Sequence, residues 1–222
     1  MLDAESFMDA QRAVLRRNFF NADEGKGSVE PYLSGGKNKV FYGVLLWHPY
    51  DISRKIEDAS HGISELVPSI PCSAGDAHVG LAVYTGSESG DKVLKKLAEA
   101  VHRAKRDLRS PLLNYDGWFH NNVTVVAAGT GNDAMDDAFV SMVNGILKNY
   151  DGNDLERKRI AQITTNRFLE RRTQEELEHA GFFGYMGSLP ALGESRPTRL
   201  GVIHHIIDKT GQTIEPYEVF DL

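Results

Sequence analysis

The sequence predicts an α+β domain in which curved antiparallel sheets form two lobes around a central groove, with helices on the outside. Three observations lead to this prediction. Apolar strand segments alternate with helical segments along the chain. Two strand–helix–strand units of similar length, residues 40–84 and 118–169, indicate a coarse duplication. One strand in each unit carries polar side chains on one face only, so that face borders a groove.

The composition is that of an ordinary globular protein. The chain has 222 residues, of which 41% are hydrophobic and 25% charged, enough for one large domain or for one domain with an appendage. A formal net charge of −6 argues against a protein that coats nucleic acid broadly. No apolar stretch approaches the roughly 20 residues of a membrane span, so we expect no membrane partner.

Cysteine content and the start of the chain indicate the compartment. Cys72 is the only cysteine, so neither an internal disulfide nor a cysteine zinc cluster can form. The first residues lack the basic start and apolar centre of a signal peptide. We therefore expect a cytoplasmic protein.

The first 38 residues are predicted to be an addition to a main domain at residues 39–222. Residues 4–18 carry Phe7 and Leu15 among charged side chains, which is typical of an amphipathic helix. Residues 21–38 are rich in glycine and charge, a composition that indicates a flexible loop.

The first unit contains a strand that carries a histidine and a glycine on the same face. Its expected elements are a strand at 40–47, a helix at 51–66 and a strand at 77–84, followed by a helix around 93–108. In the second strand, strict alternation places His78, Gly80, Ala82 and Tyr84 on one face. A glycine beside a histidine lets another group approach the backbone there.

The second unit repeats this order. Its expected elements are a strand at 118–128, a helix around 138–146 and a strand at 160–169. Alternation in the last of these puts Gln162, Thr164 and Asn166 on one face and Arg167 on the other. The structural alternative is that these polar side chains form the solvated face of an ordinary strand.

The C-terminal part is expected to complete the sheet. The predicted elements are a short helix at 174–180, a loop at 181–197, a strand at 200–207 and an edge strand at 213–222. His204 and His205 are neighbours on a strand, so they point to opposite faces and cannot bind one metal ion together. One of the two could reach the groove.

Two of these segments resemble the motifs of the two-histidine (2H) phosphoesterases, which include 2′-5′ RNA ligase-like proteins and cyclic nucleotide phosphodiesterases. That family carries two His-x-Thr/Ser motifs on strands that face one cleft. The segment His78-Val79-Gly80-Leu81 is similar to the first motif. The second motif often runs His-x-Thr-x-x-Arg-Phe, which residues 162–168 match at Thr164, Arg167 and Phe168. The resemblance covers roughly residues 40–169.

The resemblance implies a phosphodiesterase that needs no metal and no cofactor. Its substrate would be a 2′,3′-cyclic phosphate, a 2′-5′ linkage or a cyclic nucleotide. In the family one histidine is the general base, the other protonates the leaving oxygen, and the hydroxyl residues hold the phosphate. By this resemblance His78 is expected to be catalytic, and Gln162, Thr164 and Asn166 are expected to bind the substrate.

Two departures from the family pattern weaken the catalytic expectation. Gly80 stands where the first hydroxyl belongs, and Gln162 stands where the second histidine belongs. A glutamine orients a phosphate oxygen but transfers no proton. His120, on the polar face of residues 118–128, is the favoured replacement for the second histidine, ahead of His205.

Three functions remain open on this basis. The first is a divergent phosphodiesterase that acts on a nucleotide or an RNA end. The second is a catalytically weak or inactive module that binds a nucleotide or a protein on the same fold. The third is a ferredoxin-like regulatory domain in which His78 is merely structural. The sequence predicts no oligomeric state.

Overall fold

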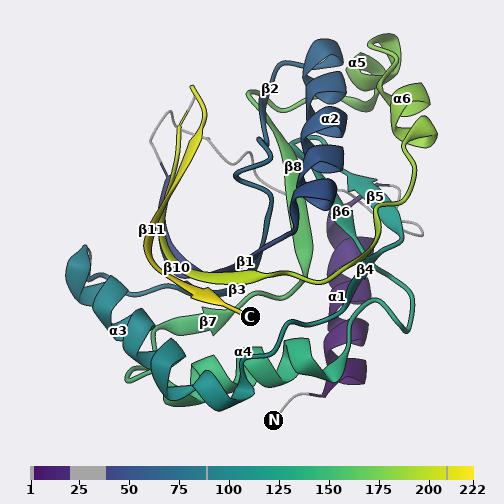
Figure 1. Ribbon diagram of the computed structural model, residues 1–222. Helices are drawn as coiled ribbons and strands as arrows, with labels where there is room; N and C mark the ends of the chain where they lie inside the picture. The colour runs from purple at the N-terminus through teal and green to yellow at the C-terminus, as the bar shows by residue number, and fades with distance from the viewer. Residues whose placement is uncertain (1–2, 21–38, 89, 209) are drawn as a thin grey trace.

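A computed structural model describes residues 3–20, 39–88, 90–208 and 210–222. Its main sheet is antiparallel, with strand order β11-β10-β1-β3-β8-β6-β5, β2 beside β8 and β7 beside β3. The helices lie outside the curved sheet (Figure 1). A small second sheet pairs β4 (Leu113–Tyr115) with β9 (Gly193–Ser195). The predicted α+β class is confirmed.

The elements have these bounds. The main-sheet strands are β1 (Lys39–Trp47), β2 (Ser69–Pro71), β3 (His78–Tyr84), β5 (Gly117–His120), β6 (Thr124–Ala128), β7 (Leu155–Arg157), β8 (Gln162–Phe168), β10 (Arg199–Ile207) and β11 (Gln212–Asp221). The helices are α1 (Ala4–Asn18), α2 (Tyr50–Leu66), α3 (Asp91–Arg103), α4 (Asp137–Asn149), α5 (Gln174–His179) and α6 (Phe182–Ser188), with a 3₁₀ turn at Lys105–Asp107. In the described ranges, no helix combines the length and the apolar character needed to cross a membrane.

The predicted duplication is visible as two halves, each of which adds a short strand to the motif strand of the other half. One half runs β1–α2–β2–β3 and the other β6–α4–β7–β8. The short strand β2 precedes β3 but pairs with the end of β8, and β7 precedes β8 but pairs with the end of β3. The helices follow the same rule, since α2 packs on β8 and α4 contacts β3 and β7. In the described register β3 and β8 themselves meet at one pair, Val79 and Ile163.

One extra residue in each central strand changes which side chains face the groove. The pairing of β1 with β3 skips Leu81, and the pairing of β6 with β8 skips Thr165. Each bulge lies three residues after the start of its motif, and each reverses the inward–outward alternation beyond it. The groove is lined by His78, Gly80, Ala82 and Val83 of β3 and by Gln162, Thr164 and Arg167 of β8, so the matching positions are 78 and 162, 80 and 164, and 83 and 167. The expectation of strict alternation, with Asn166 inward and Arg167 outward, is wrong.

The strand expected at 118–128 is two strands joined by a turn. The side chain of Asn121 accepts hydrogen bonds from the backbone N–H groups of Val123 and Thr124, at 2.9 and 2.8 Å. An asparagine that bonds the backbone two and three residues ahead closes a tight turn. The chain therefore reverses direction, so His120 and Thr124 lie on different strands of a hairpin.

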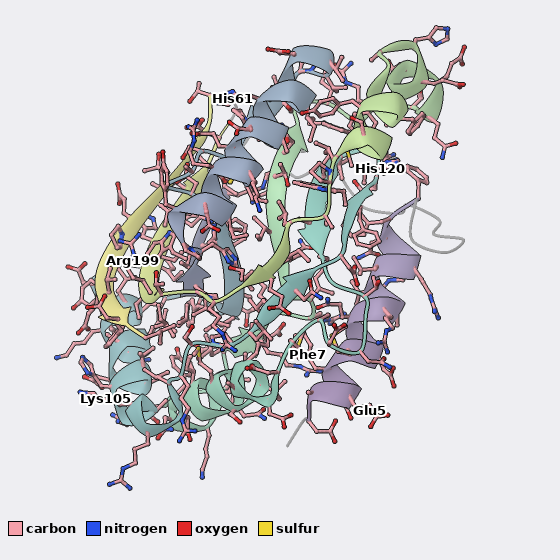
Figure 2. The ribbon with its side chains drawn as sticks, turned by 45° about the vertical axis from the view of Figure 1, so that its right-hand side comes forward. Glu5, Phe7, His61, Lys105, His120 and Arg199 are labelled. Atoms are coloured by element: carbon pink, nitrogen blue, oxygen red, sulfur yellow. The ribbon has the colours of Figure 1, made fainter. Side chains whose placement is uncertain are left out.

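The expected N-terminal helix is present and belongs to the same core as the sheet. Asp3 caps α1 by accepting a hydrogen bond from the Ser6 N–H. Phe7 points inward and meets Phe139 of α4 edge-on with ring centres 5.4 Å apart, whereas Glu5 points outward (Figure 2). Residues 21–38, predicted to form a flexible loop, lie outside the described residues.

The buried side chain of Gln11 ties α1 to the second half of the fold. Its amide N–H donates to the Gly129 carbonyl after β6, and its carbonyl accepts the Ala161 N–H before β8. A single α1 residue therefore bridges the ends of two sheet strands.

The predicted loop at 181–197 contains a helix, α6, that the sequence analysis missed. Glycines within the helix lower its intrinsic propensity. Burial of Phe182 and Met186, four residues apart on one face, stabilises it instead. The other expected helices and the strands β10 and β11 are confirmed within a few residues of their predicted bounds.

Asn166→Ala is expected to lower the free energy of unfolding by about 1–3 kcal/mol. The Asn166 side-chain amide donates to the Ser60 carbonyl and to the hydroxyls of Ser64 and Ser69, at 2.9–3.1 Å. Urea denaturation measures the effect. Thr164→Ala, two residues away on the groove side, is the control and should change stability less. An equal loss in both variants would contradict the placement of Asn166 behind the strand.

Candidate functional site

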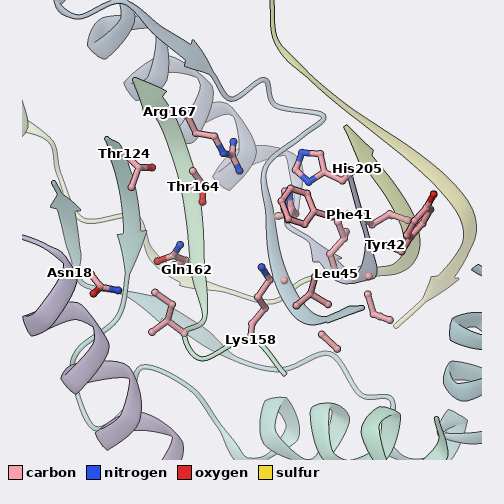
Figure 3. A pocket seen from close by; sticks show the side chains of 18 of the residues that line it. Asn18, Phe41, Tyr42, Leu45, Thr124, Lys158, Gln162, Thr164, Arg167 and His205 are labelled. Atoms are coloured by element: carbon pink, nitrogen blue, oxygen red, sulfur yellow. The ribbon is translucent and has the colours of Figure 1, made fainter. Parts of the chain in front are cut away.

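A groove of about 260 Å³ lies between the two halves of the sheet (Figure 3). Its walls come from β1, β3, β6, β8 and β10 and from the end of α1. Its lining includes the ionisable, amide and hydroxyl side chains of His78, Lys158, Gln162, Thr164, Arg167 and His205. No aspartate or glutamate is among the described residues that line it. Such a lining favours an anionic ligand.

Two histidines meet edge-on in this groove. The ring centres of His78 on β3 and His205 on β10 are 5.5 Å apart, at an interplanar angle of 85°. His205 is paired with Phe41 of β1, so the curvature of the sheet brings the far end of β10 towards the start of β3. Within the described part of the chain, the buried Nε2 of His205 has no hydrogen-bond partner. That atom is available to a ligand.

The tautomer of His78 follows from its backbone contact. Nδ1 of His78 lies 2.6 Å from the carbonyl oxygen of Asp76. A carbonyl only accepts, so we assign the N–H to Nδ1. Nε2 of His78 then keeps its lone pair and can accept a proton.

Both imidazoles are neutral at pH 7. Burial lowers the pKa of His78 to about 4, with Arg167 and Lys158 adding to the shift and the Asp76 carbonyl opposing it. Burial likewise lowers the pKa of His205 to about 3, helped by His78 and Arg167. A bound anion would raise both pKa values because it favours the charged imidazolium.

Two cations share the groove with the histidines. Arg167 is buried and donates a hydrogen bond to the Gln212 side chain at 2.7 Å. Lys158, which directly follows β7, extends into the groove (Figure 3). Loss of water around its ammonium and the nearby Arg167 charge lower the pKa of Lys158. The two side chains supply positive charge to the same groove.

The second motif contributes neutral hydrogen-bonding groups. Gln162 and Thr164 both line the groove. The side-chain oxygen of Gln162 is buried, and the described residues provide it with no partner. A primary amide can turn to present either its oxygen or its N–H₂ group. The structure thus brings His78, Gln162 and Thr164 together, as the sequence analysis expected.

Two expected site residues lie elsewhere. Asn166 turns away from the groove towards α2, because the bulge at Thr165 reverses the alternation. His120 lies at the end of β5, where its ring packs on Phe182 and Phe183 of α6 at 5.2 and 5.3 Å. Burial there lowers the pKa of His120 to about 4. The second histidine of the groove is His205, not His120.

Two further groove residues, Arg167 and Lys158, were not predicted from the sequence. Arg167 was expected on the outer face, and no sequence signal marks the bulge that turns it inward. Lys158 lies in the charged run 156–159, which resembles a solvated turn.

His204 confirms the expected divergence of the two neighbouring histidines. It faces away from the groove, stacks on Tyr42 with ring centres 5.1 Å apart and contacts Glu215 at 3.1 Å. No three histidine, cysteine, aspartate or glutamate side chains in the described ranges gather closely enough to hold a metal ion.

Comparisons with solved structures identify this fold. No protein-family model and no curated protein sequence matches the chain. TT0787 of Thermus thermophilus superposes with a TM-score of 0.54 and 14% identity, over 82% of this chain and 97% of that chain. LigT of Escherichia coli in complex with 3′-AMP superposes with a TM-score of 0.52 and 15% identity, over 83% and 98%. LigT in complex with NADP⁺ gives 0.52 and 16%, over 83% and 98%.

These neighbours belong to the 2H phosphoesterase superfamily, so the resemblance drawn from the two motifs is confirmed at the level of the fold. They are covered almost completely, whereas about one sixth of this chain has no counterpart in them.

The free energy of unfolding is expected to fall as the pH drops below about 6.5. The unfolded chain protonates its histidines near that pH, whereas His78 and His205 stay neutral in the folded state down to about pH 4 and 3. Their stabilising effect is complete above pH 6.5 and is lost as the pH falls, by about 1.4 kcal/mol per pH unit for each histidine.

Denaturant unfolding between pH 7 and 4 measures this slope. His205→Gln should reduce it by about one such increment. His61→Gln, a change at an exposed position on α2 (Figure 2), is the control. An unchanged slope in His205→Gln would show that folding does not lower the pKa of His205.

Proposed function

We propose that the groove binds a phosphate ester and that the protein is a metal-independent phosphodiesterase of nucleotides or RNA ends. The observation that carries this proposal is the edge-on pair of His78 and His205 beside Lys158 and Arg167. Phosphodiester hydrolysis without a metal needs two proton-transfer groups and positive charge near the phosphate. The groove supplies all of these.

His78 is assigned as the base because its Nδ1 faces the Asp76 carbonyl and its Nε2 keeps the lone pair. With a 2′,3′-cyclic phosphate bound, Nε2 of His78 takes a proton from water as the water oxygen forms a bond to phosphorus. The bond from phosphorus to one ribose oxygen breaks, and protonated His205 gives that oxygen a proton. Arg167 stabilises the negative charge, and Thr164 and Gln162 hold the non-bridging oxygens.

The low pKa values set a condition on this mechanism. His205 can act as an acid only when it carries a proton, and in the ligand-free groove its pKa is about 3. The negative charge of a bound phosphate raises the pKa of His205, so His205 takes up a proton when the substrate binds. Activity is therefore expected to be higher below pH 7 than above it.

The fold neighbours support the ligand class. LigT has been crystallised with 3′-AMP, with NADP⁺ and with phosphate. All three carry phosphate, and two of them are nucleotides. A groove of about 260 Å³ has the size of a small-molecule site, which suits a single nucleotide better than a duplex.

A second candidate is a nucleotide-binding module without turnover. Gln162 favours it, because a glutamine at the second motif transfers no proton. The two candidates predict the same binding and differ only in product formation.

Turnover of a 2′,3′-cyclic mononucleotide, followed by chromatography of the product, tests the proposal. His78→Ala and His205→Ala are each expected to lower kcat/KM by about 10²–10⁴. His204→Gln, a change at the neighbouring outward-facing histidine, should retain the wild-type rate. A chelator should have no effect.

Binding without turnover in the wild type would establish the binding module instead. Full activity in both His78→Ala and His205→Ala would show that the reaction takes place elsewhere.

A further inference from the structure

Gly80 and Lys158 occupy one space in the groove. A Cβ atom at position 80 would lie 3.1 Å from Cγ and 3.2 Å from Cε of Lys158. Such contacts are tighter than ordinary van der Waals distance, so any side chain at position 80 would push the lysine stem aside. Glycine at this position makes room for Lys158 to lie across the strand.

The backbone fixes where Lys158 begins. Its N–H donates to the carbonyl of Leu81 at 2.8 Å, directly beyond the pairing of β7 with β3. Leu81 is the extra residue of the bulge in β3. The bulge therefore anchors Lys158 next to Gly80, and the side chain continues across Gly80 into the groove.

The ammonium of Lys158 is available to a ligand. In the described part of the protein its Nζ makes no hydrogen bond or ion pair, whereas Lys92 and Lys96 both bind Glu88 at 2.7 and 2.9 Å. Lys158 and Arg167 line the same groove. Burial and, after it, the Arg167 charge lower the pKa of Lys158. An anion between them would relieve that repulsion.

We propose that Lys158 binds the phosphate in place of the hydroxyl that is missing at Gly80. This inference rests on the proposed function and names the group that holds the phosphate on one side of the groove. A two-fold axis through the antiparallel pair Val79 and Ile163 relates Gly80 to Thr164, so the two residues occupy equivalent positions in their strands. The phosphate is bound by the Thr164 hydroxyl on β8 and by the Lys158 ammonium that lies across Gly80 of β3.

Affinity for a nucleoside 3′-monophosphate, measured by calorimetry, tests this inference. Lys158→Gln should weaken binding by about 10- to 100-fold, the loss of a charged hydrogen bond. Lys158→Arg keeps a cationic donor and should bind within a few-fold of the wild type. Lys92→Gln removes the same charge from an exposed position outside the groove and should leave the affinity unchanged.

A double-mutant cycle tests the role of Gly80. Gly80→Ala should weaken binding when Lys158 is present and should have little further effect in the Lys158→Gln background, because it acts by moving the lysine stem. Additive losses would overturn the shared-space argument.

The outcomes separate the two proposals. Wild-type binding with equal affinity in Lys158→Gln would overturn this inference and leave the proposed function standing. No binding by the wild type would overturn the proposed function, and this inference with it. Matching thermal unfolding curves for Lys158→Gln and the wild type would exclude misfolding as the cause of a lost affinity.

Discussion

The reciprocal pairing of β2 with β8 and of β7 with β3 is the constraint on which the groove depends. The described register joins the two motif strands directly at Val79 and Ile163 alone, so the exchanged strands and helices hold the halves together. Because α2 covers β8 and α4 covers β3, apolar burial stabilises the junction from both sides. The groove is the concave face that this junction leaves open.

The two halves have the same geometry and different chemistry. Each motif strand presents three groove residues at the same spacing, and each has its bulge at the same position. The first half supplies a histidine and a glycine, the second a glutamine and a threonine. His205 and Lys158 add an imidazole and a cation from β10 and from the end of β7. The site is therefore assembled from more of the chain than the two motifs.

The sequence predicts the parts of this fold that depend on local pattern. Long apolar periodicities located the strands β1, β3 and β8 and the helices α1 to α4, because burial dictates those patterns directly. The bulge at Thr165 depends on the register with β6, and no residue type in β8 indicates it. Arg167 and Asn166 were therefore assigned to the wrong faces. The pairing of His205 with His78 follows from sheet curvature, a property of the whole assembly. Asn121 was a turn signal inside an apolar run and could have been recognised.

The exchange of short strands has a consequence for how the protein can be divided. A single half, cut out of the chain, would expose the end of its motif strand as an open sheet edge. Two copies of such a half, related by a two-fold axis through the central pair, could cover each other's edges by swapping β2 or β7. The present chain thus has the topology of a domain-swapped dimer whose subunits are joined in one polypeptide, and its halves should fold together rather than in sequence.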